Sequence, residues 1–361
     1  MCIRDRSSQS SAGAVVDVSL HPFSARLGTA LSGYAIYLYQ TLVPIDLAFF
    51  YPLPRPPNSN KLTLVIAAIL LATLSGVAWR ERGERPYLLT GWLWFLGTLV
   101  PMIGLVQLGG ARGADRYTYV PIVGLFIALT WWVPSVLPDR DWVRRGLPAV
   151  ALVVVGILAT AASIQAGYWR TQHALFTRTL EVAGPSTFAH DGLARALVSQ
   201  GRHDVAIAAF ERALEIDPDH TETRIRLAVT LKDRGQLQDA LDQLRRSAGD
   251  PGYYSEAQFQ MAIVFSLQKR FSEAIAALKQ VEPAGPLQAD RTRDAELLIG
   301  RVLIAKGETE RAIQHWQIVL ELRPDAHEIH RALGETYLEQ GDSTRGGHHL
   351  EKAAQIEALL R

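Results

Sequence analysis

A small residue recurs at nearly constant intervals in the second half of the sequence, at Ala206, Ala240, Ala274, Ala312 and Gly346. The successive intervals are 34, 34, 38 and 34 residues. Intervals of this length are typical of a repeated pair of antiparallel helices, in which a small side chain lets the second helix approach closely. Because one such pair cannot bury its apolar face alone, successive pairs must stack. The spacing therefore predicts an α-helical solenoid over residues 169–361.

A second position in each unit supports this prediction. Five residues before the small side chain stands Gly201, Gly235, Gly307 or Gly341, and Lys269 takes this place in the third unit. A glycine at the end of a helix adopts a left-handed conformation that other residues avoid, so it marks the turn between two helices. The pattern resembles the tetratricopeptide repeat (TPR). We expect about five repeats, more than the roughly three that a continuous core requires.

The first half of the sequence has a different composition. Most of the Lys, Asp and Glu residues lie after Trp169, and five mostly apolar segments precede it. Apolar segments of about twenty residues are long enough to cross a bilayer as helices. The five segments are 27–51, 62–79, 87–108, 118–137 and 147–168. We therefore expect an all-α protein, with a multi-span transmembrane domain over residues 19–168 followed by the solenoid.

The first apolar segment has two possible placements. Pro44 and Asp46 interrupt residues 27–51. Proline breaks a helix, and a carboxylate inside a membrane is costly unless it is paired, functional or at the interface. The segment either crosses the bilayer or lies at its surface as a broken helix.

The arginines between the segments predict their orientation. Two connections that lie on the same side, if every segment spans, carry three arginines each: Arg80, Arg82 and Arg85, and Arg140, Arg144 and Arg145. Short loops rich in Lys and Arg stay on the cytoplasmic side. We therefore expect the solenoid, and the polar loop at residues 109–121, on the non-cytoplasmic side.

The composition argues against several other classes of protein. A net charge of +1, with no basic tract interleaved with aromatic residues, argues against a nucleic-acid-binding surface. The single Cys2 excludes an internal disulfide framework and a cysteine-based zinc site. The sequence has no phosphate-binding P-loop, no nucleophile elbow and no His-Glu-x-x-His motif. We expect neither a metal nor a cofactor.

The N-terminal residues are not expected to contribute to the fold. Residues Met1–Arg6 contain no apolar core that could serve as a signal peptide, and they resemble adapter-derived read-through. We expect residues 1–18 to be non-native or disordered, and the natural gene to continue upstream.

A polar loop lies between the third and fourth apolar segments. It contains Asp115, Arg116, Tyr117 and Tyr119 within five positions. A guanidinium offers a planar fork of donors that matches a phosphate, so the loop can hold an anionic headgroup. Alternatively, the tyrosines belong to an interfacial aromatic belt and the two charges form a local pair at a helix start. Both interpretations remain open from the residues alone.

The first helices of the repeats are expected to line the concave groove of the solenoid. The residues predicted for this partner-binding groove are Phe188, Asp191, Arg195, Glu222, Ile225 and Val229. They are mixed in character, and the next inner-face position carries Gly192, Arg226, Leu298 and Ala332. This argues against an asparagine ladder of the kind that binds peptide backbones, and against a basic clamp for terminal carboxylates.

The run from Ala114 to Gly124 (ADRYTYVPIVG) resembles a motif of the transmembrane TPR O-mannosyltransferase family and its bacterial relatives. The resemblance implies a multi-span (GT-C) glycosyltransferase that uses a polyprenyl-phosphate-linked sugar on the non-cytoplasmic face of the bacterial inner membrane. It also implies that Arg116 holds the donor phosphate, that Asp115 orients it, and that Tyr117 or Tyr119 packs against the lipid or sugar.

The resemblance also sets expectations about activity. The family's catalytic carboxylate lies in a loop for which this chain has no counterpart. The chain is therefore expected to be the C-terminal portion of such an enzyme, inactive by itself, with an acceptor or another protein bound by its TPR domain. The alternative is a non-enzymatic, membrane-anchored TPR scaffold for protein–protein interactions.

Overall fold

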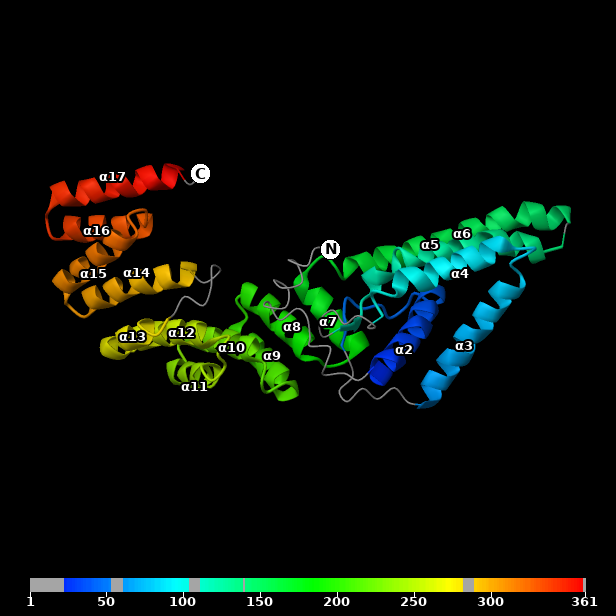
Figure 1. Cartoon of the computed structure of the whole chain (residues 1–361), viewed down its shortest axis with the longest axis horizontal. Helices are drawn as coiled ribbons and strands as arrows, with labels where there is room; N and C mark the ends of the chain where they lie inside the picture. Colours follow the sequence, from blue (N-terminus) through cyan, green and yellow to red (C-terminus); the bar gives the residue numbers. More distant parts are fainter. Residues whose placement is uncertain (1–22, 53–60, 104–110, 139, 282–288, 360–361) are drawn as a thin grey trace. The chain divides into compact units, whose positions relative to one another are not determined.

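The computed structural model describes residues 23–52, 61–103, 111–138, 140–281 and 289–359. The chain forms two compact units, residues 1–196 and 197–361. Helices make up nearly all of the described structure in both units, in agreement with the all-α prediction (Figure 1). The expected N-terminal region, residues 1–18, lies outside the described residues.

The first unit contains seven described helices. They are α2 (Phe23–Leu42), α3 (Lys61–Arg80), α4 (Pro86–Leu99), α5 (Pro121–Val136), α6 (Asp141–Gly167), α7 (Gln172–Ala183) and α8 (Thr187–Ser199). The last of these continues into the second unit. The residues that we assigned to the start of the solenoid, in α7 and most of α8, thus belong to the first compact unit.

Two helices of the first unit are long and apolar enough to cross a membrane, α3 and α6. They correspond to the expected segments 62–79 and 147–168. α5 is apolar but has only 16 residues, and α4 has 14. The multi-span arrangement expected from the sequence is therefore not supported beyond α3 and α6 in the part of the chain that the structure describes.

α4 and α5 pack tightly side by side (Figure 1). A Cβ atom on Gly91 would lie 2.3 Å from the carbonyl oxygen of Gly124, and one on Gly124 would lie 2.4 Å from that of Gly91. Small residues at this crossing let the two backbones approach each other. Phe95 and Leu99 of α4 are buried beside the contact, together with Tyr37 of α2.

The first expected segment, residues 27–51, is not one continuous helix. α2 ends at Leu42, two residues before Pro44. Proline lacks an amide hydrogen and disfavours the helical conformation in the residue before it, so the helix ends here. Asp46 then adopts a left-handed conformation with φ of 55°. The segment from 43 to 50 is an irregular connection.

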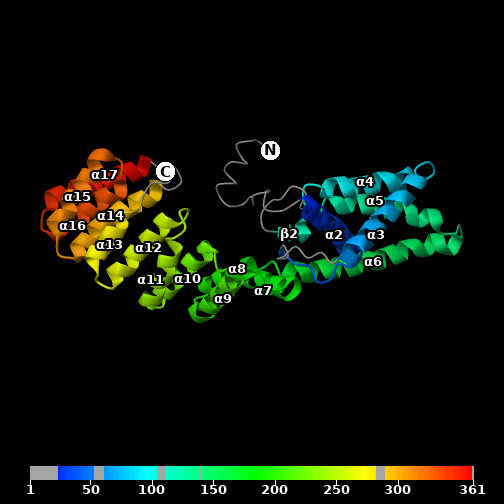
Figure 2. The same cartoon turned by 60° about the horizontal axis from the view of Figure 1, so that its bottom comes forward.

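A small antiparallel pairing follows this connection. β1 (Tyr51–Pro52) pairs with β2 (Ala111–Gly113), so that Tyr51 faces Gly113. β2 also contacts α2, and Figure 2 shows the two close together. Strands of two and three residues carry no detectable alternation of polar and apolar side chains, so the sequence did not predict them.

The second unit is a stack of helix pairs (Figure 2). Its helices are α9 (His203–Ile216), α10 (Thr221–Asp233), α11 (Leu237–Ser247), α12 (Tyr254–Leu267), α13 (Phe271–Leu278), α14 (Ala289–Ala305), α15 (Thr309–Leu322), α16 (His327–Glu339) and α17 (Ser343–Leu359). From α10 to α17 each helix packs on the next one along the chain. This is the solenoid that the sequence interval predicts.

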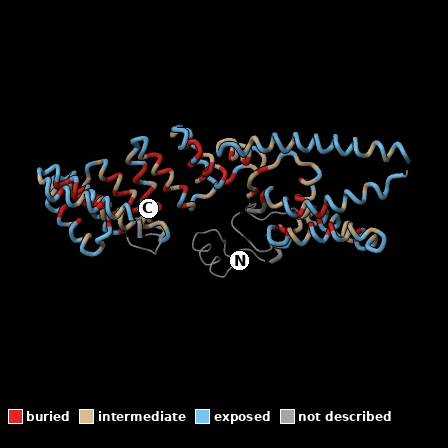
Figure 3. The backbone as a smooth tube through the Cα atoms, turned by 90° about the horizontal axis from the view of Figure 1, so that it is seen from above, coloured by how far each residue is buried: buried red, intermediate tan, exposed pale blue. Residues whose placement is uncertain are grey.

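The small residues of the interval lie inside the stack. Ala206, Ala240, Ala274 and Ala312 are fully buried. In the last unit, a Cβ atom on Gly346 would lie 2.7 Å from the side chain of Leu338, which explains why glycine replaces alanine there. Buried backbone collects along the helix pairs of the second unit, whereas the long helices of the first unit are mostly exposed (Figure 3).

The turns within the pairs have the predicted backbone conformation. Gly201, Gly235, Gly307 and Gly341 have φ values between 72° and 87°, and Lys269 adopts φ of 60° at the same position of the third repeat. Each turn is closed by the same hydrogen bonds, for example from the Gly235 amide to the Lys232 carbonyl at 2.9 Å. Lys269 therefore adopts a left-handed conformation that glycine adopts more readily than lysine.

Candidate functional site

The part of the polar loop that follows β2 starts at Ala114, whose backbone is held by the buried Tyr37. The Ala114 amide donates to the Tyr37 hydroxyl at 3.1 Å, and that hydroxyl is 3.3 Å from the Ala114 carbonyl oxygen. The next residues, Asp115–Thr118, form one turn of 3₁₀ helix, and Pro121 starts α5. This part of the loop is therefore held at one end by Tyr37 and at the other by the start of α5 at Pro121.

The Asp115 carboxylate is buried and accepts no hydrogen bond of good geometry from the residues that the structure describes. Burial raises the pKa of Asp115 to about 6, and the nearby Tyr51 hydroxyl and Ala48 amide only partly oppose this rise. The Tyr51 hydroxyl accepts from Gln40 Nε2 at 2.7 Å and from the Ala48 amide at 3.0 Å, so its own proton remains available to donate toward Asp115. Asp115 can therefore hold or release a proton near neutral pH.

The Arg116 guanidinium lies over two aromatic rings. It is 5.1 Å from the ring centroid of Phe49 and 5.1 Å from that of Tyr117. This cation–π arrangement holds a guanidinium without consuming its hydrogen-bond donors. Arg116 is exposed and forms no ion pair with any described residue, Asp115 included. The local Asp115–Arg116 pair of the interfacial interpretation is therefore not formed in this structure.

The two tyrosines of the loop differ in their surroundings. Tyr117 is half-buried and packs against the core formed by α2, α4 and α5. Tyr119 is 69% exposed. The structure thus brings together Asp115, Arg116 and Tyr117, and it leaves Tyr119 on the surface. Their assignment to a sugar donor stays a prediction.

Phe49 and Arg178 are parts of this neighbourhood that the sequence analysis missed. The Phe49 ring lies 5.4 Å from Trp169 and 6.1 Å from Phe176, and Arg178 of α7 pairs with Asp46 at 2.9 Å. These contacts fix the connection between α2 and β1 against α7. The three consecutive aromatic residues at 49–51 are the feature of the sequence from which this neighbourhood could have been predicted.

The residues predicted for the groove occupy several environments. Phe188 packs on Phe50 with ring centroids 4.4 Å apart. Asp191 is only 5% exposed and lies 3.1 Å from Arg195, whose side chain is about half exposed. In the second repeat Ile225 is buried.

The other two groove residues lie on α10. Glu222 is exposed and pairs with Arg226, and Val229 is half-buried. Among the predicted set, Phe188, which is 40% exposed, and Arg195, Glu222 and Val229 therefore keep surface available for a partner.

No group of three or more His, Cys, Asp or Glu side chains that could hold a metal ion occurs among the described residues. The polar loop offers a guanidinium stacked on aromatic rings, beside a buried carboxyl group of raised pKa. This combination suits the recognition of an anionic group.

The repeated helix pairs define the class of protein: an all-α chain that contains tetratricopeptide repeats. Models of this repeat match residues 197–250, described as "Tetratricopeptide repeat", and residues 300–341, described as "TPR repeat". Both matches fall in the second unit. Solenoids of this class are suited to binding other proteins.

Two curated proteins of the mouse are similar to parts of the chain. Sperm-associated antigen 1 is 32% identical over 118 residues, which cover 33% of this chain and 12% of that protein. The protein O-mannosyl-transferase TMTC1 is 24% identical over 213 residues, which cover 56% of this chain and 22% of that protein. The chain thus spans less than a third of the length of these relatives.

Among solved structures, the fold is similar to that of YrrB, described as a TPR protein with an unusual peptide-binding site. The two are 17% identical with a TM-score of 0.37, and the likeness covers 51% of this chain and 92% of that chain. At this identity the likeness concerns the fold alone.

Proposed function

We propose that this protein is a membrane-attached scaffold whose TPR solenoid binds segments of partner proteins. The observation that carries this proposal is the continuous stack from α10 to α17, with its regularly buried small residues and its two matches to the repeat. A stack of this kind presents an extended surface that can bind partner proteins without catalytic groups.

Attachment to a membrane is supported by the exposed side chains of α6. This helix has 27 residues, and Leu152, Val153 and Ile157 are each more than 60% exposed. A continuous apolar surface of this length is costly in water and favourable in lipid. We place α3 and α6 in a bacterial inner membrane, with the solenoid on the non-cytoplasmic side, as the distribution of arginines favours.

Membrane attachment can be tested by extraction. Membranes from cells that express the full chain are washed with alkaline carbonate, and the chain should remain in the pellet. Val153→Arg together with Ile157→Arg should release a large fraction of it, whereas Leu322→Arg on the exposed surface of α15 should not. Release of the unmodified chain would contradict the proposal.

Partner binding can be tested with the full chain in lipid nanodiscs against an array of immobilised peptides. Binding should weaken when Val229→Asp places a charge on α10, and it should persist when Arg212→Asp changes the charge on the surface of α9. If Val229→Asp bound the same peptides with unchanged strength, the predicted groove would not be the peptide-binding surface.

A second function is favoured by the Arg116 guanidinium, which forms an ion pair with no residue that the structure describes. In transfer from a polyprenyl-phosphate-linked sugar, the phosphate carries away charge as the sugar's anomeric carbon is attacked. A fixed cation beside that phosphate stabilises the transition state more than the ground state. Arg116 over Phe49 and Tyr117 supplies such a cation. The similarity to a relative named as an O-mannosyl-transferase supports the same proposal.

The donor site is tested by binding, a readout that does not require the complete reaction. Polyprenyl-phosphate-linked sugar is titrated into nanodiscs that carry the chain, and bound lipid is counted by native mass spectrometry. Arg116→Ala should abolish binding, and Arg116→Lys should retain a part of it because the charge remains. Arg140→Ala, at the start of α6, is the matched control. Equal binding by Arg116→Ala would exclude the donor site.

A further inference from the structure

A cavity of about 370 Å³ lies between α13, α14 and α15 of the second unit. Its floor is apolar and consists of Ile275, Ile299, Leu303 and Ile318. Ile299 and Leu303 are buried, whereas Ile318 is 58% exposed. This α13–α15 cavity therefore has room for an aliphatic or aromatic side chain beyond those of the described residues that line it.

The rim of the α13–α15 cavity is basic. Lys279, Lys306 and Arg311 line it, and no carboxylate does so among the described residues. Lys306 lies 2.9 Å from Glu308, and Arg311 pairs with the same carboxylate. Lys279 forms no ion pair with any residue that the structure describes. Among the described residues, the three rim cations thus pair with one carboxylate, that of Glu308.

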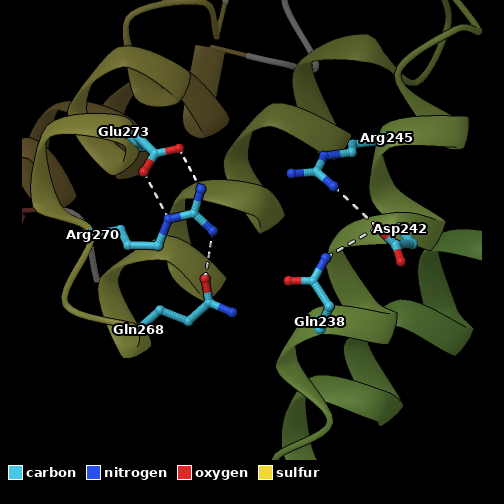
Figure 4. A network of polar contacts seen from close by, with 6 residues as sticks. All are labelled: Gln238, Asp242, Arg245, Gln268, Arg270 and Glu273. Atoms are coloured by element: carbon cyan, nitrogen blue, oxygen red, sulfur yellow. Dashed lines mark hydrogen bonds and ion pairs between the residues drawn. The ribbon is translucent and has the colours of Figure 1, made fainter.

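The preceding interface in the stack shows what a neutralised rim looks like. In the register of the repeats, Lys279 corresponds to Arg245 and Arg311 corresponds to Glu273. Arg245 pairs with Asp242 at 3.1 Å, and Glu273 pairs with Arg270 at 2.5 Å (Figure 4). Two cations therefore meet two carboxylates at the α11–α13 surface.

Two substitutions between the repeats remove this balance at the α13–α15 cavity. Ala276 stands where the previous repeat has Asp242, so Lys279 loses its local carboxylate. Lys306 stands where the previous repeat has Gln268, so a cation is added, whereas Glu308 and Arg311 only exchange the charges of Arg270 and Glu273. Because the fold is the same at both interfaces, folding does not require the excess positive charge.

We propose that the α13–α15 cavity is a second protein-binding site, for a short segment of a partner that places an apolar side chain next to carboxylates. The apolar side chain enters the floor, and the carboxylates face Lys279 and the rest of the rim. Apolar burial supplies affinity, and the opposite charges supply specificity and orientation. The inference rests on the proposed role of the solenoid in binding proteins, and it adds a site away from the predicted groove.

The test uses the full chain in nanodiscs and a fluorescein-labelled peptide with a Leu-Phe core flanked by Asp and Glu residues. The peptide should bind saturably. A peptide with Lys in place of the acids, and one with Ser in place of Leu and Phe, should both bind at least about tenfold more weakly, because each lacks one of the two complementary features.

Two pairs of variants locate the bound peptide. Lys279→Glu should weaken binding about tenfold, whereas Arg245→Glu, at the corresponding position of the neutralised α11–α13 surface, should leave it within about twofold. Ile318→Ser should also weaken binding, and Leu322→Ser, one turn further along α15 and 80% exposed, should not. All four positions are more than half exposed or at a helix end, so the variants are expected to fold.

The outcomes separate this inference from the proposed function. Equal weakening by Lys279→Glu and Arg245→Glu would show general charge attraction and overturn the inference. Failure of the acidic peptide to bind, while the chain still binds array peptides in a way that depends on Val229, would overturn the inference and leave the scaffold intact. Phosphatidylglycerol vesicles that compete with the peptide at the Lys279 site would assign the site to lipid headgroups instead.

Discussion

The Nδ1 atoms of His330 and His349 lie 2.9 Å apart, at the contact between α16 and α17. His330 is only 3% exposed, and its Nε2 atom lies 3.2 Å from the Pro324 carbonyl oxygen. A carbonyl can only accept, so Nε2 of His330 carries the proton. Neutral His330 then accepts at Nδ1 from the N–H of His349. The hydrogen bond between the two rings persists while at least one of them is neutral, and it is lost when both are protonated.

The charges around the pair all oppose protonation. Burial lowers the pKa of His330 and of His349, and Lys352 and His348 lower both pKa values further. The ring of Tyr337 stacks on His349, and the Arg345 guanidinium lies over the Tyr337 ring, 4.5 Å from its centroid. No described carboxylate pairs with either histidine.

The first prediction is that acid loosens the last repeat. A histidine with a lowered pKa in the folded state binds fewer protons than in the unfolded state. Stability is then fully present above the ordinary histidine pKa and decreases as the pH falls below about 6.5. Hydrogen exchange of the α16 and α17 amides, corrected for intrinsic rates, should therefore be faster at about pH 5 than at about pH 7.5.

The control for this prediction is the adjacent histidine. His349→Phe keeps an aromatic ring against Tyr337 and should reduce the pH dependence, while His348→Gln should preserve most of it. A pH dependence in His349→Phe equal to that of the unmodified chain would assign the effect to other groups.

The second prediction concerns the turn of the third repeat. Lys269 adopts φ of 60°, which costs an ordinary residue about 1–2 kcal/mol relative to right-handed conformations. Lys269→Gly should therefore raise the free energy of unfolding of the solenoid by about 1 kcal/mol after the entropy of glycine is subtracted. Gly235→Lys, at the same position of the second repeat, should lower it. Urea denaturation of the two variants measures both shifts, and shifts of the same sign would contradict the explanation.

The solenoid and its turns are the part of the fold that the sequence predicts best. The solenoid was predictable because Ala206 and its counterparts repeat at a fixed interval, and each meets the same packing requirement. Lys269 departs from the glycine consensus, yet the surrounding repeats impose the left-handed turn on it. The repeat interval therefore predicted the backbone conformation of this turn correctly, although lysine is not the residue that usually adopts it.

The candidate site was less predictable because its contacts are not periodic. Asp115, Arg116 and Tyr117 were identified as a cluster since they are adjacent in sequence. Phe49 and Tyr51 lie more than sixty residues away in the chain, and only the folded connection between α2 and β1 brings them to the loop. The short irregular connection over residues 43–50 carries no sequence pattern that specifies such a partner.

The membrane domain was predicted from hydropathy, which measures composition and not helix length. The third and fourth segments appeared long enough to span because apolar residues continue beyond the helices. α4 ends at Leu99, two residues before Pro101, and α5 begins only at Pro121. Prolines thus shortened two helices that apolar counting had extended.

The third prediction tests the contact between α4 and α5. Gly91→Ala would place a methyl group 2.3 Å from the Gly124 carbonyl oxygen, so the helices must separate. We expect a loss of about 1–3 kcal/mol, seen as a lower thermal midpoint of the detergent-solubilised chain. Gly97→Ala in the same helix meets nothing within 4 Å and should be neutral or stabilising by up to about 1 kcal/mol. Equal destabilisation by both variants would remove the close approach as the cause.

The fourth prediction concerns the ion pair that fixes the connection between α2 and β1. Arg178 lies 2.9 Å from Asp46, but the Asp46 side chain is 73% exposed, so solvent screens the attraction. Asp46→Asn, which also tolerates the left-handed conformation, should cost less than about 1 kcal/mol. Arg178→Ala should cost more, because Arg178 also contacts Glu181 at 3.5 Å and lies over the Tyr168 ring. Thermal unfolding of both single variants and of the double variant gives the coupling energy, and a coupling above about 2 kcal/mol would show that the pair is far better shielded than its exposure implies.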